Sequence, residues 1–163
     1  MGEGGNLMRI LLAAGDDPRE GRMHRMLEAT GHEVFRAASR GEELLGSIGE
    51  VGNLHVAVVS QASLGRGWPR LLRQLRKGAP SVPVVLLLGP KAERAWRLAV
   101  LAGAFEAVSA SVPEEAAFQA VNRAMAYAVG RVVGEISMGA AGEANGRSAV
   151  PGLARDVAVA TRT

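Results

Sequence analysis

The sequence predicts an α/β domain in which helices cover both faces of a parallel sheet. Short, strongly apolar runs alternate with longer amphipathic stretches along most of the chain, and this rhythm is typical of repeated strand–helix units. Glycine and proline residues separate many of the stretches, as expected where one element ends and the next begins. The length of 163 residues is sufficient for one such domain with its own core.

The first strand–helix unit begins with the apolar run Met8–Ala13, which we expect to be a buried strand. A helix should follow from Pro18 to about Thr30, because proline fits the first turn of a helix and an aspartate before it can cap the free amides. Gly31 is suited to end that helix, since glycine tolerates the left-handed backbone found after helices.

Two further units follow in the middle of the chain. Glu33–Ala37 and His55–Ser60 are the expected second and third strands, and Gly41–Ile48 is the helix between them. After a loop, Pro69–Lys77 has the apolar spacing of a third helix, with leucines recurring three and four residues apart. The proline and glycine that follow should end it.

The last units contain the most apolar strand, Val82–Leu88, as expected for a strand covered on both faces. We expect a fourth helix over Lys91–Leu101, a short fifth strand over Phe105–Val108, and a long helix that begins at Pro113. Five such units favour a flavodoxin-like, doubly wound (βα)5 layout with strand order 2-1-3-4-5. In that layout, ligands bind at the carboxyl ends of the strands.

Both ends of the chain differ from this body. The predicted domain covers residues 8–133, whereas residues 1–7 and 134–163 show no sustained apolar periodicity. The C-terminal segment is rich in Gly, Ala and small polar residues. We therefore expect both ends to be flexible.

Composition excludes several classes of function. The chain has no cysteine, so disulfides and thiol nucleophiles are ruled out, and its three histidines are too scattered to predict a metal site. We expect no cofactor. Apolar runs are too short to cross a bilayer and no export signal is visible, so a cytoplasmic location is expected. The net charge of +3 rests on arginine and only weakly suggests an anionic partner.

Three landmarks resemble the receiver domains of bacterial response regulators, the CheY-like family. The run from Met8 through Asp16, Asp17 and Pro18 is similar to their first strand and acidic cluster, followed by an amphipathic helix and Gly31-His-Glu-Val34. The segments 82–89 and 102–107 are similar to their fourth and fifth strand regions. The resemblance covers residues 8–133 and implies the same fold.

Active receivers bind magnesium with an acidic pair after the first strand and accept phosphate on an aspartate that ends the third strand. A hydroxyl ends the fourth strand and a lysine ends the fifth, and these groups stabilise the transferred charge. Here these family positions hold other residues: Gly15 for one acid, Ser60 for the acceptor, Leu88 or Gly89 for the hydroxyl, and Ala110 for the lysine. The only other aspartate is Asp156, so no shift of register restores the acceptor. Asp16 and Asp17 are expected mainly to cap the helix.

The resemblance therefore implies a pseudo-receiver, a protein–protein interaction module of bacterial signalling with no catalytic residue. Receivers commonly pair through the face that here carries Arg94, Arg97, Leu98, Phe105 and Glu106, and such a contact leaves a homodimer open. Another hypothesis is a small-ligand or nucleotide sensor that uses the vacated pocket. A third is a nucleic-acid-associated regulator, the less favoured partner class. That regulator would use the basic cluster of the third helix region: Arg66, Arg70, Arg73, Arg76 and Lys77. A solvated face is the simpler explanation of this cluster, and a docking patch for an acidic partner or a phosphate-bearing ligand is the alternative.

Overall fold

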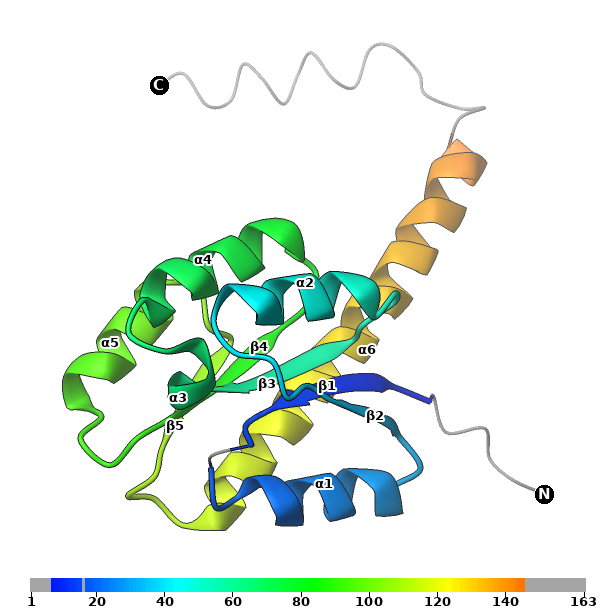
Figure 1. Ribbon diagram of the computed structural model, residues 1–163. Helices are drawn as coiled ribbons and strands as arrows, with labels where there is room; N and C mark the ends of the chain where they lie inside the picture. The colour runs from blue at the N-terminus through cyan, green and yellow to red at the C-terminus, as the bar shows by residue number, and fades with distance from the viewer. Residues whose placement is uncertain (1–6, 16, 146–163) are drawn as a thin grey trace, which may run out of the picture. The chain divides into compact units, whose positions relative to one another are not determined.

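A computed structural model describes residues 7–15 and 17–145, and for residues 132, 133 and 135–145 it describes the backbone alone. Its centre is one five-stranded parallel sheet in the order β2-β1-β3-β4-β5 (Figure 1). The predicted doubly wound layout and strand order are therefore confirmed. β1 lies between β2 and β3, with Ile10 opposite both Val34 and Val56.

The five strands agree with the predicted ones to within two residues at each end. Three of them are flanked by strands on both sides, and β3 and β4 are buried along their whole length, as their unbroken apolar sequences predict. Their bounds are β1 Arg9–Ala13, β2 Glu33–Arg36, β3 Val56–Ser60, β4 Val84–Leu88 and β5 Glu106–Ser109.

Each predicted helix is present, and a short extra one follows β3. The extra helix lies where the sequence predicts only a loop. The helices are α1 Glu20–Ala29, α2 Glu42–Glu50, α3 Gln61–Leu64, α4 Trp68–Gly78, α5 Glu93–Leu101 and α6 Glu114–Asn145. The glycine after α1, Gly31, has a positive φ of 81°, which confirms the expected helix end.

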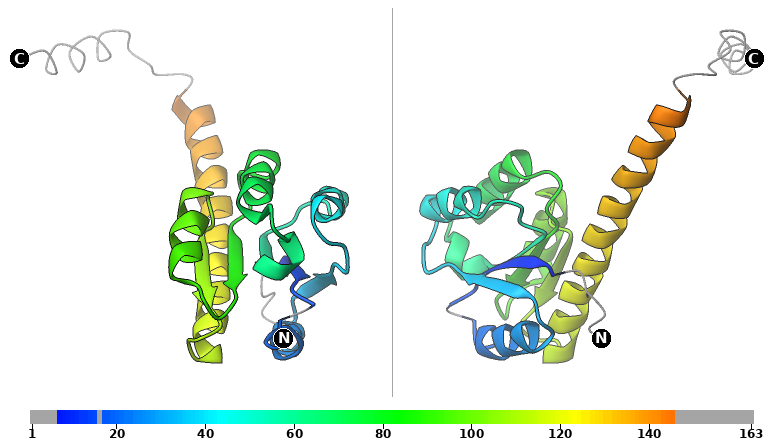
Figure 2. Two further views of the ribbon diagram at one scale, coloured as in Figure 1. Left: turned by 60° about the vertical axis from the view of Figure 1, so that its left-hand side comes forward. Right: turned by 90° about the vertical axis from the view of Figure 1, so that its right-hand side faces the viewer.

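Helices cover both faces of the sheet (Figure 2). On one face, alternate strand residues such as Leu11, Val59 and Leu86 pack with the apolar sides of α2, α4 and α5 in one buried cluster. The opposite face is covered by α1 and the first half of α6, which an ion pair between Arg22 and Glu114 joins. This second arrangement completes the two layers of helices that a doubly wound sheet requires.

The end of the domain differs from the prediction. The expected boundary at Val133 is wrong for the last helix, because α6 continues without a break to Asn145. Residues 134–145 lack an apolar stripe and contain three glycines as well as three alanines, so neither apolar periodicity nor helix propensity predicts this part of α6. The expected flexible segments at 1–6 and 146–163 lie outside the described residues. A division into two compact units falls after Ala128, and the sites below all lie in the first unit.

Candidate functional site

Most of the predicted phosphorylation-site residues gather at the carboxyl edge of the sheet. An open pocket of about 790 Å³ is lined there by Asp17, Ser60, Leu88, Gly89 and Ala110, together with Gln61, Arg66 and Trp68. Gly15 lies in the exposed turn after β1 and does not line the pocket. Asp16 lies outside the described residues. The structure therefore brings most of these residues together in one pocket.

Among the described residues, the side chain of Ser60, at the acceptor position, forms hydrogen bonds only with the nearby residue Ser63. Its side chain is buried at the end of β3, and its Oγ accepts a hydrogen bond from the backbone N–H of Ser63 at 3.0 Å. The same Oγ donates to the Ser63 hydroxyl at 2.8 Å. Ser60 is thus the N-cap of α3, a role for which serine is strongly preferred.

The other two key positions provide backbone rather than side-chain chemistry. The amide of Gly89 donates to Oε1 of Gln61 at 3.2 Å, which ties the end of β4 to α3. The amide of Ala110 donates to the carbonyl of Leu88 at 3.1 Å. Neither Leu88 nor Ala110 has a polar side chain, so they supply no hydroxyl and no ammonium group to a phosphate at this edge.

A buried arginine that the sequence analysis did not single out lies at the same edge. Arg19 is only 7% exposed. Its Nε and Nη2 donate to the two carboxylate oxygens of Asp17 at 2.8 and 2.7 Å. The backbone N–H of Arg19 also donates to Asp17 Oδ1 at 2.9 Å. This is a bidentate pair, the strongest geometry for a guanidinium and a carboxylate.

The guanidinium of Arg19 also reaches the ends of two strands. Its Nη1 donates to the carbonyl of Ser109 at 3.1 Å, and its Nη2 donates to the carbonyl of Leu88 at 3.3 Å. One side chain therefore connects the start of α1 with the ends of β4 and β5. Burial raises the pKa of Asp17, but the hydrogen bonds and charge of Arg19 outweigh this effect, and the net pKa lies below its ordinary value of 3.8.

The described residues at this edge do not fit a magnesium ion. Among those that line the pocket, Asp17 is the only acidic residue, and both its oxygens already accept hydrogen bonds from Arg19. Magnesium requires several oxygen ligands in near-octahedral geometry. Within the described residues, no group of three or more His, Asp or Glu side chains is arranged to hold a metal ion.

The predicted basic cluster divides into two kinds of residue. Arg76 is half-buried; its Nη1 donates to the carbonyl of Val82 at 2.7 Å, and a Cβ atom at Gly103 would lie 3.0 Å from its Cγ. Arg76 therefore has a structural role. The other four cations are exposed on α4 and the loop before it: Arg66, Arg70, Arg73 and Lys77.

The predicted interface lies on α5 and β5, and α6 adds to it. Phe105 contacts Tyr127, with 5.2 Å between ring centroids, and Glu106 forms an ion pair with Arg123. α5 turns its alanines inward, since Ala99 is buried whereas Trp96, Leu98 and Leu101 are 50%, 47% and 80% exposed. Sequence analysis missed Trp96, Leu101 and Tyr127. Small residues at 95, 99 and 102 were the available signal for which side of α5 faces the sheet.

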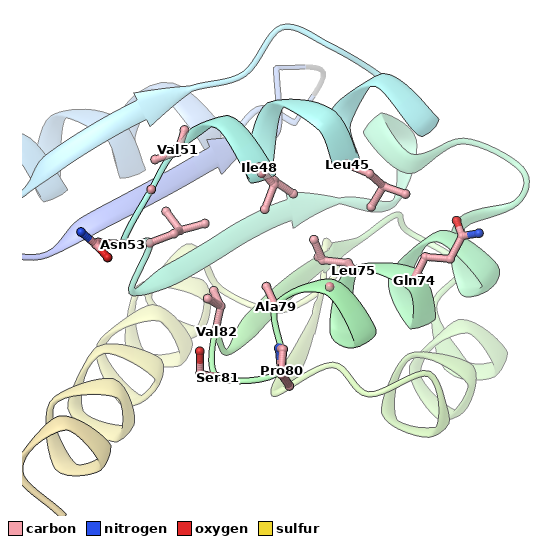
Figure 3. Close-up of a pocket in the computed structure, with 14 residues that line it drawn as sticks. Leu45, Ile48, Val51, Asn53, Gln74, Leu75, Ala79, Pro80, Ser81 and Val82 are labelled. Atoms are coloured by element: carbon pink, nitrogen blue, oxygen red, sulfur yellow. The ribbon is translucent and has the colours of Figure 1, made fainter. Parts of the chain in front are cut away.

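A separate, mostly apolar hollow lies between α2 and α4 at the opposite, amino edge of the sheet (Figure 3). Its volume is about 470 Å³, and side chains of Ile48, Val51, Leu75 and Val82 line it. Only Asn53, Gln74 and Ser81 contribute polar side chains, and no charged residue lines it. The hollow therefore offers no acid or base that could activate its one hydroxyl, that of Ser81.

Comparisons with known proteins agree with the geometry of the sheet. No protein-family model and no curated protein matches the chain. A receiver-domain protein from Clostridium thermocellum matches 73% of this chain and 94% of its own, with 25% identity and a TM-score of 0.60. A putative response regulator from Chloroflexus aurantiacus matches 74% of this chain and 99% of its own, with 22% identity and a TM-score of 0.63.

A CheY-like receiver-domain protein from Methanospirillum hungatei matches 77% of this chain and 99% of its own, with 21% identity and a TM-score of 0.64. Across residues 7–15 and 17–145, no helix is both long and apolar enough to span a membrane. The three structural matches cover nearly the whole of each solved structure and about three-quarters of this chain. The chain has the fold of response-regulator receiver domains.

Proposed function

We propose that this protein is a signalling module with a receiver fold that is not phosphorylated, catalyses no reaction and acts by binding a protein partner. The observation that carries the proposal is the Arg19–Asp17 pair. The guanidinium of Arg19, which is always charged, neutralises Asp17. Asp17 lies at the edge of the sheet where active receivers hold the acidic residues that bind magnesium. Ser60, in place of the acceptor, caps a helix and cannot form an acyl phosphate.

The absence of a switch favours a constant conformation. Phosphorylation acts by shifting the populations of two states, and it needs a group whose charge changes. Arg19 instead connects α1 with the ends of β4 and β5 through fixed hydrogen bonds. Control would then depend on the abundance or binding of the partner rather than on phosphate.

The surface formed by α5, β5 and α6 is the proposed binding face. Large apolar side chains are exposed on α5, and the partly exposed rings of Phe105, just before β5, and Tyr127, on α6, contact each other. Arginine and aromatic residues are enriched at protein interfaces, and Arg94 and Arg97 lie on the same helix. A second copy of this chain or another signalling protein would bind there.

Two measurements test the proposal. After incubation with acetyl phosphate and magnesium, intact-mass spectrometry should detect no phosphorylated protein; a phosphoryl adduct on an acidic residue at the carboxyl edge would contradict the loss of the site. Proteins that co-purify with the tagged protein are then purified, and their binding to it is measured directly. Self-association of the protein is measured by analytical sedimentation. Leu98→Arg should abolish binding and Ala29→Arg, an exposed control on α1, should not; equal binding by both variants would contradict the assigned face.

A further inference from the structure

A second pocket lies at the carboxyl edge of the sheet, at the amino end of α5. We call it the α5 pocket. It is open to solvent and has a volume of about 960 Å³, within the range of small-molecule sites. It is formed by the loop after β4, the first turns of α5 and the segment after β5: Pro90, Lys91, Ala92, Glu93, Arg94, Trp96, Arg97, Ser109 and Ser111.

The cations of this pocket have no carboxylate partner among residues 7–15 and 17–145. Lys91, Arg94 and Arg97 are exposed, and among the described residues none has a carboxylate within 4.0 Å. Glu93 is the one acidic residue of the lining, so the pocket has a net positive charge. Such a site attracts anions, and arginine binds phosphate with paired hydrogen bonds.

An aromatic ring and two hydroxyls complete the lining. Trp96 is 50% exposed, whereas the other tryptophan, Trp68, is only 7% exposed. An indole face in this position can stack on a planar ring. Across from α5, the hydroxyls of Ser109 and Ser111 lie 2.8 Å apart and can exchange hydrogen bonds with a sugar or a phosphate.

We propose that the α5 pocket binds a nucleotide, a small molecule that joins an aromatic base to phosphate groups. The cations match the phosphates, Trp96 matches the base, and the pocket lies at the carboxyl edge of a parallel sheet, where such folds bind ligands. A single stacking residue beside three cations favours a small ligand with one base over a long nucleic acid. The α5 pocket borders the vacated phosphorylation pocket, with which it shares Pro90. It shares Arg94 and Arg97 with the proposed binding face, but nucleotide binding there does not depend on the proposed function.

Calorimetry and tryptophan fluorescence test the proposal. The intact protein is titrated with the mono-, di- and triphosphates of adenosine and guanosine. Separate titrations use adenosine, guanosine and pyrophosphate. At least one nucleotide should bind saturably and change the emission of Trp96. The nucleosides and pyrophosphate should each bind about tenfold or more weakly, since each lacks one half of the contacts. The fluorescence change should disappear in Trp96→Phe, which keeps Trp68.

Paired charge reversals locate the site. Arg94→Glu with Arg97→Glu should weaken nucleotide binding by about tenfold or more, whereas Arg70→Glu with Arg73→Glu on α4 changes the net charge equally and should keep the affinity within about twofold. Equal weakening by both pairs would indicate general electrostatic attraction and overturn the site. Binding of pyrophosphate as tight as that of nucleotides, tighter binding of an acidic peptide or duplex DNA, or no nucleotide binding at millimolar concentration would also overturn it.

Discussion

Two groups of cations lie at the carboxyl edge of the sheet, and they differ in what surrounds them. Arg19 is buried, and its guanidinium makes four hydrogen bonds, two to Asp17 and two to backbone carbonyls. Lys91, Arg94 and Arg97 are exposed and, among the described residues, lack a carboxylate partner. The first cation completes the fold, and the other three remain available to a ligand.

The difference has a simple physical cause. A buried charge is costly unless it is paired and hydrogen-bonded, so Arg19 can be tolerated only because Asp17 and the strand ends satisfy it. Exposed cations keep their water and need no partner. An exposed cationic group therefore contributes little to stability and can serve binding, whereas a buried one fixes the positions of the elements around it.

Arg19→Ala should have the largest effect, because it leaves the half-buried carboxylate of Asp17 without its partner and the two strand-end carbonyls without their donor. Removing one member of a fully buried pair costs about 3–5 kcal/mol, so we expect a loss of about 2 kcal/mol in the free energy of unfolding for this partly buried pair, as measured by denaturant titration. Arg97→Ala, the exposed control, should stay within about 0.5 kcal/mol of the parent protein. Similar losses in the two variants would remove the distinction between buried and exposed cations.

The pair of Arg19 and Asp17 should also make the stability of the protein depend on pH in the acidic range. Because the folded-state pKa of Asp17 lies below 3.8, its stabilising contribution is fully present above pH 3.8. It is lost as the pH falls through the lower folded-state value. Asp17→Asn should therefore lower stability at neutral pH and flatten the fall in stability below pH 4, measured by unfolding at a series of pH values. If Asp17→Asn left the dependence of stability on pH below pH 4 unchanged, the carboxylate of Asp17 would not be stabilised by Arg19.

Within the basic cluster of α4, Arg76→Ala should cost about 1 kcal/mol of stability, because a half-buried hydrogen bond to the carbonyl of Val82 is lost. Arg73→Ala, three residues earlier and exposed, provides the matched comparison and should have no measurable effect on the midpoint of unfolding. If the two midpoints shifted equally, Arg76 would belong with the exposed cations.

The smallest effect on stability is expected at the α5 pocket. Arg94→Ala and Lys91→Ala should each change the free energy of unfolding by less than about 0.5 kcal/mol, because neither side chain is buried. Thermal unfolding with and without added nucleotide distinguishes stability from binding, since a bound ligand raises the unfolding temperature. A large loss of stability without ligand would assign these residues to the fold instead.

The fold could be predicted because its determinants are local. Apolar runs such as Val82–Leu88 specify buried strands, and residues such as Gly31 specify where helices end. The alternation of these strands and helices favours the doubly wound layout, and that layout implies the strand order. The ends of the strands placed Ser60, Leu88 and Ala110 at one edge. α3 was missed because the cap from Ser60 to Ser63 occupies a single turn.

The roles of the arginines could not be predicted because they depend on tertiary contacts. Arg19 follows Asp17 by two residues, but nothing in that spacing places the carbonyls of Leu88 and Ser109 within reach. Arg76 was grouped with its exposed neighbours because helical spacing alone does not reveal the carbonyl of Val82. Trp96 was missed because the alanines of α5, rather than its large apolar residues, face the sheet.

The central claim, a receiver fold without receiver chemistry, is tested most directly by amide NMR spectra recorded with magnesium and beryllofluoride, a mimic of the phosphoryl group. We predict no saturable shifts at the amides of Ser60, Gly89 and Ala110, because no acceptor carboxylate follows β3 and Arg19 holds Asp17. Saturable, magnesium-dependent shifts at these amides would contradict the claim.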